Sequence, residues 1–394
     1  MILLETKYPL WDKNIQGHLK PLTMKIALVI FRFGPSHGSV LQTYALTRIL
    51  ESMGHKVTII DRQRPIKISD YCEMFMRVLS HIRRKTFSWS DFYVNEFPPI
   101  LMRDIRGFIK SQLWKQIITI HKDADLIEIG RDNYDAFIVG SDQTWRPKYV
   151  YNVLNYFLDF VPKERKVKRI AYAPSFGTAE WEYSKDIESK ARELVQRFDA
   201  VSVREDTGVG LCLDHFGVNA IHVLDPTLLL TEKNYKKFVA KTEGVKYIGY
   251  NLLDFSKEKL DFVNTIKEKI GMPTRQLISM GDKNKRKIHE KVAPSIEEWL
   301  TGIANSELLI VDSFHATVFA IIFHKEFLTI ANAARGLSRF TSLLKIVDLE
   351  NRLVTDFDKF DNNIVNNKID WSIVDENIQR MRKVSMDFLT SSLQ

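Results

Sequence analysis

The chain repeats one pattern, in which a short apolar run is followed by a polar loop and then by a stretch with helical spacing. Residues 24–31 are the first apolar run, residues 33–39 the loop and residues 40–50 the helical stretch, and residues 56–61 form a second apolar run. Two strands joined through a helix in this way are parallel neighbours in a βαβ unit. Because the pattern returns after residue 134, we expect an α/β protein built on parallel sheets.

The length of 394 residues suits about two domains of this kind. We expect two Rossmann-like domains facing a cleft, the first at 24–235 and the second, with a C-terminal helix, at 236–394. Residues 1–23 show no periodicity and are interpreted as an N-terminal extension. Between about 66 and 130 the strand–helix alternation stops, which predicts a helical insertion in the first domain.

One part of this insertion is amphipathic and basic. Its apolar face is formed by Ile105, Ile109, Leu113, Ile117 and Ile118. We expect the face to pack on its own domain. The alternative is peripheral contact of residues 66–122 with an anionic membrane face or a lipid-linked acceptor, since Lys and Arg flank the face.

The composition is that of an ordinary globular protein, with 45% hydrophobic and 27% charged residues. Cys72 and Cys212 have no metal-site or disulfide-framework spacing, which favours a reducing compartment. No apolar run reaches the ~18 residues of a membrane span, and the start lacks signal-peptide features, so a cytoplasmic location is expected. The net charge is +8, but no nucleic-acid-binding motif accompanies it. No HExxH motif or acidic metal cluster is present, so no metal and no cofactor are predicted.

The strongest candidate for a functional site follows the apolar run 308–311. Residues 312–317 (DSFHAT) lead into a further apolar stretch, and the whole reads as buried strand, turn and buried helix. Asp312 or Ser313 would cap this helix, whose first N–H groups would bind an anion. His315 at the helix start can gain or lose a proton near neutral pH. A purely structural, hydrogen-bonding histidine is the alternative.

Polar groups also follow other predicted strands, at the sheet edge where ligands bind in open α/β folds. The loop carrying Gly38 and Ser39 suits a phosphate-bearing ligand, because its amides can approach closely. Asp142 follows the strand at 134–140 and would bind a sugar hydroxyl or a basic side chain, or cap its turn. Arg204 ends a short strand, where a surface ion pair with an adjacent acid is the alternative to ligand binding.

Taken together, several stretches resemble the polysaccharide pyruvyl transferase family, in the family's order, across about residues 24–350. They are Gly38–Leu46, Asp135–Trp145, Ser202–Glu205, Val223–Thr227, Glu298–Leu300, Asp312–Thr317 and Ser338–Arg339. The resemblance implies a fold similar to GT-B glycosyltransferases. It also implies transfer of a carboxyvinyl group from phosphoenolpyruvate to a sugar of a cell-surface or exopolysaccharide precursor, free or lipid-linked, closing a pyruvate ketal across two hydroxyls.

The resemblance also implies roles for individual residues. His315 is similar to the family's catalytic histidine, expected as general acid and then base, and Arg204 to its donor-binding arginine. The expected donor-binding residues are Arg339, Arg335, Ser313, Gly38 and Ser39, since a carboxylate and a phosphate call for guanidinium and amide groups. The expected acceptor-binding residues are Asp142, Gln143 and Trp145.

The sequence departs from the family's pattern at several positions. Many members have Asp-Arg-Leu-His where this chain has Asp312-Ser313-Phe314-His315, so Arg335 or Arg339 would have to replace the arginine. The residue after the histidine, commonly glycine, is Ala316. Two rival functions stay open: a GT-B glycosyltransferase using a nucleotide sugar, and a non-catalytic glycan-binding relative.

Overall fold

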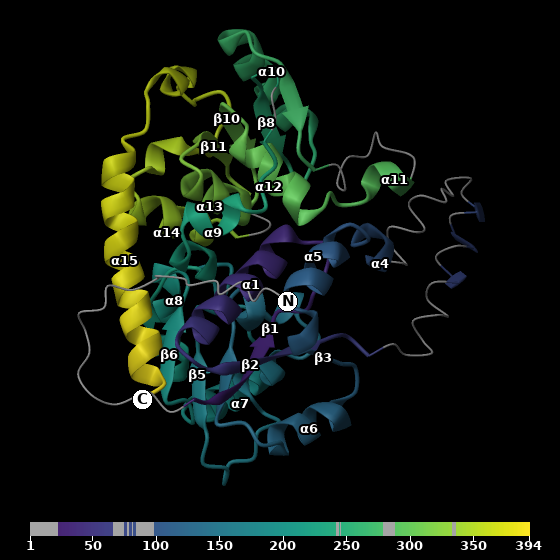
Figure 1. Ribbon diagram of the computed structural model, residues 1–394, viewed down its shortest axis with the longest axis vertical. Coiled ribbons are helices and arrows are strands. Elements are labelled where there is room, and N and C mark those ends of the chain that lie inside the picture. Colours follow the sequence, from purple (N-terminus) through teal and green to yellow (C-terminus); the bar gives the residue numbers. More distant parts are fainter. Residues whose placement is uncertain are drawn as a thin grey trace, which may run out of the picture.

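The computed structural model describes residues 23–65, 75–76, 79–80, 82–83, 98–241, 244, 246–278, 288–332 and 336–394. The predicted extension at 1–23 therefore lies outside the described residues except for its last position. Figure 1 shows two α/β domains, one above the other, with a long helix running along both. Among the described residues, no helix has the length and apolar character needed to cross a membrane.

The first domain is built on a sheet of seven described strands in the order β3-β2-β1-β4-β5-β6-β7, all parallel. The strands are β1 (Lys25–Ile30), β2 (Lys56–Arg62), β3 (Ile117–Ile120), β4 (Ala136–Val139), β5 (Lys168–Ala171), β6 (Ala200–Val203) and β7 (Ile221–His222). The strands β1 and β4 are apolar almost throughout because helices cover both faces of the sheet. The predicted βαβ unit is confirmed, with α1 (His37–Ser52) joining β1 to β2.

The second domain has five described strands in the order β12-β11-β10-β8-β9, again all parallel. They are β8 (Ile248–Asn251), β9 (Thr274–Gln276), β10 (Leu308–Val311), β11 (Glu326–Ile330) and β12 (Leu353–Val354). The predicted α/β class with two Rossmann-like sheets is thus confirmed. The short helix α9 (Glu232–Lys236) crosses the expected domain boundary at 235/236, and the position of that boundary stays a prediction.

In both sheets the strand order reverses next to the first strand, between β1 and β4 and between β8 and β10. Loops leave the sheet in opposite directions at such a point, which is where open α/β folds bind ligands. The helices α1 and α13 (Phe314–Ile322) begin there, after β1 and β10. One hydrophobic core contains Leu41 of α1 and Phe319 of α13, so the two sheets face each other across these helices.

The expected helical insertion is only partly helical. The described part contains α4 (Pro98–Leu101), α5 (Ile105–Gln112) and α6 (Asp123–Arg131), and Ile105, Ile109 and Leu113 are buried as expected. However, residues 117–120 form the edge strand β3, parallel to β2, so Ile117 and Ile118 do not extend the helical face. A 3-10 turn at Trp114–Gln116 ends the helix, and β-branched residues favour the strand that follows.

The C-terminal helix α15 (Trp371–Ser392) starts beside the second domain and ends beside the first (Figure 1). The Ser385 hydroxyl accepts a hydrogen bond of 2.9 Å from the Leu224 amide. Phe388 packs against Tyr172, the residue that follows β5. The last helix of the second half of the chain therefore covers part of the first domain.

Direct contacts also join the domains near the start of α1. His37 Nε2 lies 2.8 Å from the Pro294 carbonyl oxygen, and its ring stacks on Trp299 of α12 (Ile296–Ala304). At another point, a Cβ on Gly336, whose φ is +101°, would lie 1.5 Å from the Gly177 carbonyl oxygen. Only glycine permits this backbone contact between the domains.

The buried His37 predicts a loss of stability in acid. Burial lowers its pKa from 6.5 to about 4, so the unfolded chain takes up the proton first as the pH falls. The His37 contribution is complete above pH 6.5 and is lost between about pH 6.5 and 4, which amounts to about 2 kcal/mol at pH 5. Urea unfolding at pH 7 and 5 should show a smaller difference for His37→Gln than for wild type. The exposed His121→Gln is the control, and equal pH dependence in wild type and His37→Gln would contradict the assignment.

Candidate active site

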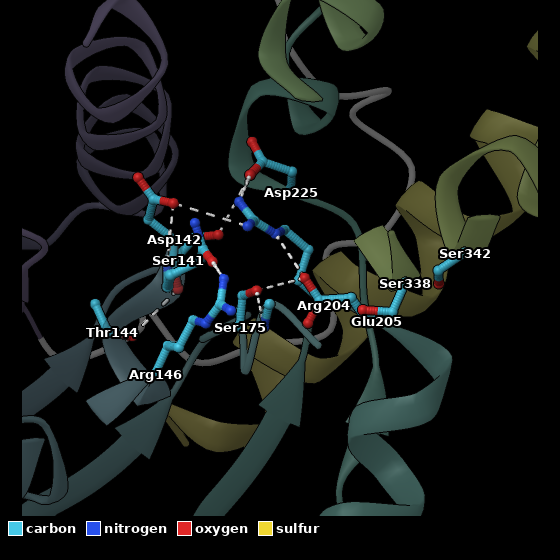
Figure 2. A network of polar contacts seen from close by, with 12 residues as sticks. Ser141, Asp142, Thr144, Arg146, Ser175, Arg204, Glu205, Asp225, Ser338 and Ser342 are labelled. Atoms are coloured by element: carbon cyan, nitrogen blue, oxygen red, sulfur yellow. Dashed lines mark hydrogen bonds and ion pairs between the residues drawn. The ribbon is translucent and has the colours of Figure 1, made fainter. Parts of the chain in front are cut away.

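Five chain segments meet at one place between the domains, and Figure 2 shows the part of this site around Asp142, Arg204 and Asp225. Each segment follows a strand: Gly38 after β1, Asp142 after β4, Arg204 after β6, Asp225 after β7 and His315 after β10. Apart from the glycine, each of these residues as a whole is nine-tenths or more buried. The sequence-predicted site residues on different strands are thus brought together at the facing carboxyl edges of both sheets.

Asp225 connects the two domains chemically. Its Oδ2 atom accepts a hydrogen bond of 2.8 Å from Arg204 Nη1 and lies 3.5 Å from His315 Nε2 in the second domain. Its Oδ1 atom accepts bonds from the Thr227 amide and hydroxyl, at 3.0 and 2.6 Å. Burial alone would raise the pKa of Asp225, but the charges of His315 and Arg204 hold it well below its usual range. Asp225 is therefore a fixed carboxylate facing the imidazole.

The Arg204 guanidinium is oriented by carboxylates on several sides. In addition to the bond from Nη1 to Asp225, Nε donates a hydrogen bond of 3.3 Å to Glu205 Oε1. The same oxygen accepts a hydrogen bond of 2.5 Å from the Ser175 hydroxyl. Its Nη2 lies 3.8 Å from Asp142 Oδ1 and makes no hydrogen bond within the described part of the chain. The predicted surface ion pair with Glu205 thus exists but is buried. Two edges of the guanidinium are therefore fixed by carboxylates, and the third carries a buried donor without a hydrogen bond among the described residues.

A second guanidinium lies close by. The Arg339 guanidinium carbon is 5.7 Å from the centre of the Phe314 ring, and that of Arg204 is 4.4 Å from the same centre. Cations near an aromatic face are attracted by its quadrupole. Burial and then the charge of Arg204 lower the pKa of Arg339 to about 10, although Asp142 and Glu205 act in the opposite direction. Phe314 therefore borders two buried cations that repel each other.

Gly38 lies directly against the candidate catalytic histidine. A Cβ at this position would be 2.0 Å from His315 Nδ1 and 2.3 Å from its Cγ. The first turn of α1, capped by Ser36 through its bond to the Ser39 amide, thus covers one side of the imidazole. The other ring nitrogen, Nε2, faces Asp225 and has no hydrogen bond within the described residues.

The predicted capping of α13 is wrong in its details. Ser313 is the N-cap residue, but its side chain makes no capping bond. Asp312 instead accepts bonds from the Leu253 and Asp254 amides and from Lys259 Nζ, so it ties the loop after β8 to β10. A carboxylate with three donors in its own domain is more stable there than at the helix end.

The remaining predicted site residues lie in different surroundings. Gln143 is buried beside Asp142 and accepts a bond of 3.0 Å from Arg146 Nη1. Trp145 is fully buried, donates from Nε1 to the Tyr156 carbonyl and stacks on Phe157, so its contacts are those of a core residue. Arg335 lies outside the described residues. No group of metal-binding side chains is found in the described ranges.

Sequence reasoning did not assign a site role to Asp225, Glu205 or Phe314. Asp225 and Glu205 belong to two of the stretches that carry the family resemblance, which was the available signal. The place of Asp225 in the site depends on two contacts between distant parts of the chain. Asp225 is 21 residues from Arg204 and 90 residues from His315 in the sequence. No local pattern encodes such pairings.

Comparison with solved structures finds chains similar in overall arrangement. A UDP-GlcNAc 2-epimerase from Neisseria meningitidis bound to UDP-GlcNAc is 12% identical with a TM-score of 0.49, covering 93% of this chain and 100% of that one. The UDP-GlcNAc 2-epimerase from Methanocaldococcus jannaschii is 13% identical with a TM-score of 0.48, covering 90% and 92%. No curated protein sequence matches the chain.

The fold and site define a two-domain α/β protein of the GT-B type, with Rossmann-like sheets that share a buried charged site at their facing edges. The family model for polysaccharide pyruvyl transferase matches residues 37–333, which include the described site residues up to His315. The chain belongs to the polysaccharide pyruvyl transferase family.

Proposed function

We propose that this protein transfers the carboxyvinyl group of phosphoenolpyruvate to two hydroxyls of a sugar in a polysaccharide precursor, forming a pyruvate ketal. Family membership supports this reaction class. The observation that carries the proposal is the buried Asp225 carboxylate, held between Arg204 Nη1 at 2.8 Å and His315 Nε2 at 3.5 Å. This arrangement combines an oriented proton donor with an oriented anion-binding group.

In the proposed mechanism His315 is the general acid. Asp225 lies 3.5 Å from Nε2 and orients the imidazole, as a carboxylate does in other histidine-based sites. Protonation of the methylene carbon of phosphoenolpyruvate creates an oxocarbenium-like centre, which a sugar hydroxyl attacks. The second hydroxyl then replaces phosphate. One hydroxyl proton balances the proton given to the methylene carbon, and the other leaves with the phosphate.

In this proposal the donor's carboxylate and phosphate are held by buried cations. Arg204 Nη2 has no hydrogen bond within the described residues, and a charged, buried donor strengthens anion binding. Arg339, close to the same Phe314 ring, supplies the second guanidinium that many family members have at the position of Ser313. Ser313, Gly38, Ser39 and Arg335 stay predicted donor contacts, and Asp142 and Gln143 predicted acceptor contacts.

Two measurements test the proposal. Phosphoenolpyruvate should raise the thermal unfolding midpoint of the wild type and of His315→Ala, but not of Arg204→Lys, because binding to the native state alone stabilises it. Phosphate release with a panel of p-nitrophenyl hexosides that carry 1,2- or 1,3-diols should fall by about 10²–10⁴-fold in His315→Ala. The exposed His121→Ala is the matched control. Stabilisation by a uridine diphosphate sugar but not by phosphoenolpyruvate would overturn the proposal in favour of a glycosyltransferase.

A further inference from the structure

Asp142 has a backbone conformation that side-chain-bearing residues almost never adopt. Its φ is 79° and its ψ is −176°, a region populated essentially by glycine. The surrounding hydrogen bonds impose this shape: the Asp142 carbonyl accepts bonds from the Ser175 and Thr144 amides, at 2.8 and 2.7 Å. Glycine would satisfy the same backbone bonds without strain. The aspartate side chain therefore requires a reason at this position.

Capping of the turn explains only one oxygen of the side chain. Oδ1 accepts a bond of 2.9 Å from the Gln143 amide and lies 3.8 Å from Arg204 Nη2. The other oxygen, Oδ2, makes no hydrogen bond within the described part of the chain. Figure 2 shows one carboxylate oxygen of Asp142 directed away from Arg204. The side chain is 12% exposed, so this oxygen is accessible but confined.

The Arg204 guanidinium lies between Asp142 and the Asp225–His315 pair. Nη1 of the guanidinium contacts Asp225, which faces His315, whereas Nη2 faces Asp142. If the guanidinium holds the donor, the histidine lies on one side of it and the Asp142 carboxylate on the other. Addition of a hydroxyl across the donor's double bond needs an acid at the methylene carbon and a base at the attacking hydroxyl.

We propose that Asp142 is the general base for the acceptor, an assignment that rests on the proposed function. The acceptor O–H bond breaks as the new bond from its oxygen to C2 of the donor forms, and the proton passes to Asp142 Oδ2. At the same time the donor's methylene carbon takes a proton from His315. When the second hydroxyl adds, the C2–O bond to phosphate breaks and the proton already on Asp142 passes to the departing phosphate. The proton of the second hydroxyl replaces it on Asp142 and is then released to solvent, while His315 takes up one proton from solvent, which restores both groups.

Three substitutions at this position separate chemistry from strain. Asp142→Gly removes the carboxylate and the strain, Asp142→Ala removes only the carboxylate, and Asp142→Asn keeps the shape without the base. All three should lower the turnover for phosphate release with the p-nitrophenyl hexosides at least 100-fold. Affinity for phosphoenolpyruvate should be kept or increased, because a negative charge beside Arg204 is lost. The unfolding midpoint of Asp142→Gly should exceed that of Asp142→Ala by a few degrees.

Rescue by a small carboxylate makes the test specific. Added formate should restore turnover at least tenfold in Asp142→Gly, where the space is open, and should leave Asp142→Asn unchanged. A structural cap would not respond to formate in this way. Turnover of Asp142→Gly within tenfold of wild type, or the absence of rescue, would overturn the assignment. A wild-type protein that neither binds phosphoenolpyruvate nor releases phosphate would instead overturn the proposed function itself.

Discussion

Replacing Arg204 with methionine should lower the free energy of unfolding by about 3–5 kcal/mol, since it strands buried carboxylates without their cation. The side chains of Arg204, Glu205 and Asp225 are 1%, 2% and 0% exposed, so water cannot replace the lost guanidinium. Asp225 would keep the Thr227 and Ser141 bonds, but among the described residues Glu205 would keep only the bond from the Ser175 hydroxyl. The same substitution should abolish stabilisation by phosphoenolpyruvate.

Urea unfolding of Arg204→Met and of the double variant Arg204→Met/Asp225→Asn measures this effect. Removing the stranded charge of Asp225 should recover at least 1 kcal/mol in the double variant, as expected for residues in direct contact. Arg131→Met is the matched control. The Arg131 side chain, which pairs with Glu128, is 62% exposed, and ion pairs on the surface contribute little to the free energy of unfolding. A loss below 1 kcal/mol for Arg204→Met would show that the cluster relaxes or that water enters.

Replacing Gly38 with alanine should reduce turnover by about 10²-fold or more while leaving most of the protein folded. The new Cβ would lie 2.0 Å from His315 Nδ1, and the neighbouring atom belongs to a rigid, buried ring rather than to a flexible side-chain end. Either the first turn of α1 or the imidazole must move, which displaces Nε2 from Asp225. Misplacement of a reacting group by about 1 Å is enough for a loss of this size.

Gly34→Ala is the matched control for this substitution. Gly34 lies in the same loop after β1, and a Cβ there would meet nothing within 4 Å. Steady-state phosphate release and thermal unfolding should therefore be close to wild type for Gly34→Ala. Overpacking at Gly38 should also cost about 1–3 kcal/mol of stability. Wild-type turnover in Gly38→Ala would mean that the imidazole is free to shift without loss of function.

The sequence predicted the elements that present the site because their signals are local. Apolar runs gave the strands, and the polar residues after them were correctly expected at the carboxyl ends of parallel strands, as for Arg204 after β6 and His315 after β10. The same local reasoning was wrong for Ile117 and Ile118, where helical spacing and β-branched residues competed. It also expected Asp312 at the helix start, whereas its carboxylate is bound within the second domain.

Partners at the site were decided only by tertiary structure. The sequence by itself determined that acids, arginines and a histidine stand at strand ends, because secondary structure depends on neighbouring residues. The way the two sheets meet decides which acid faces the histidine and which glycine contacts its ring. Packing within the first domain decides that Trp145 is a core residue. Asp225 and His315 are 90 residues apart in the chain but 3.5 Å apart between the closest atoms. Such contacts arise from packing between distant segments. Unlike the hydrophobic periodicity of a helix or strand, this packing produces no local pattern in the sequence.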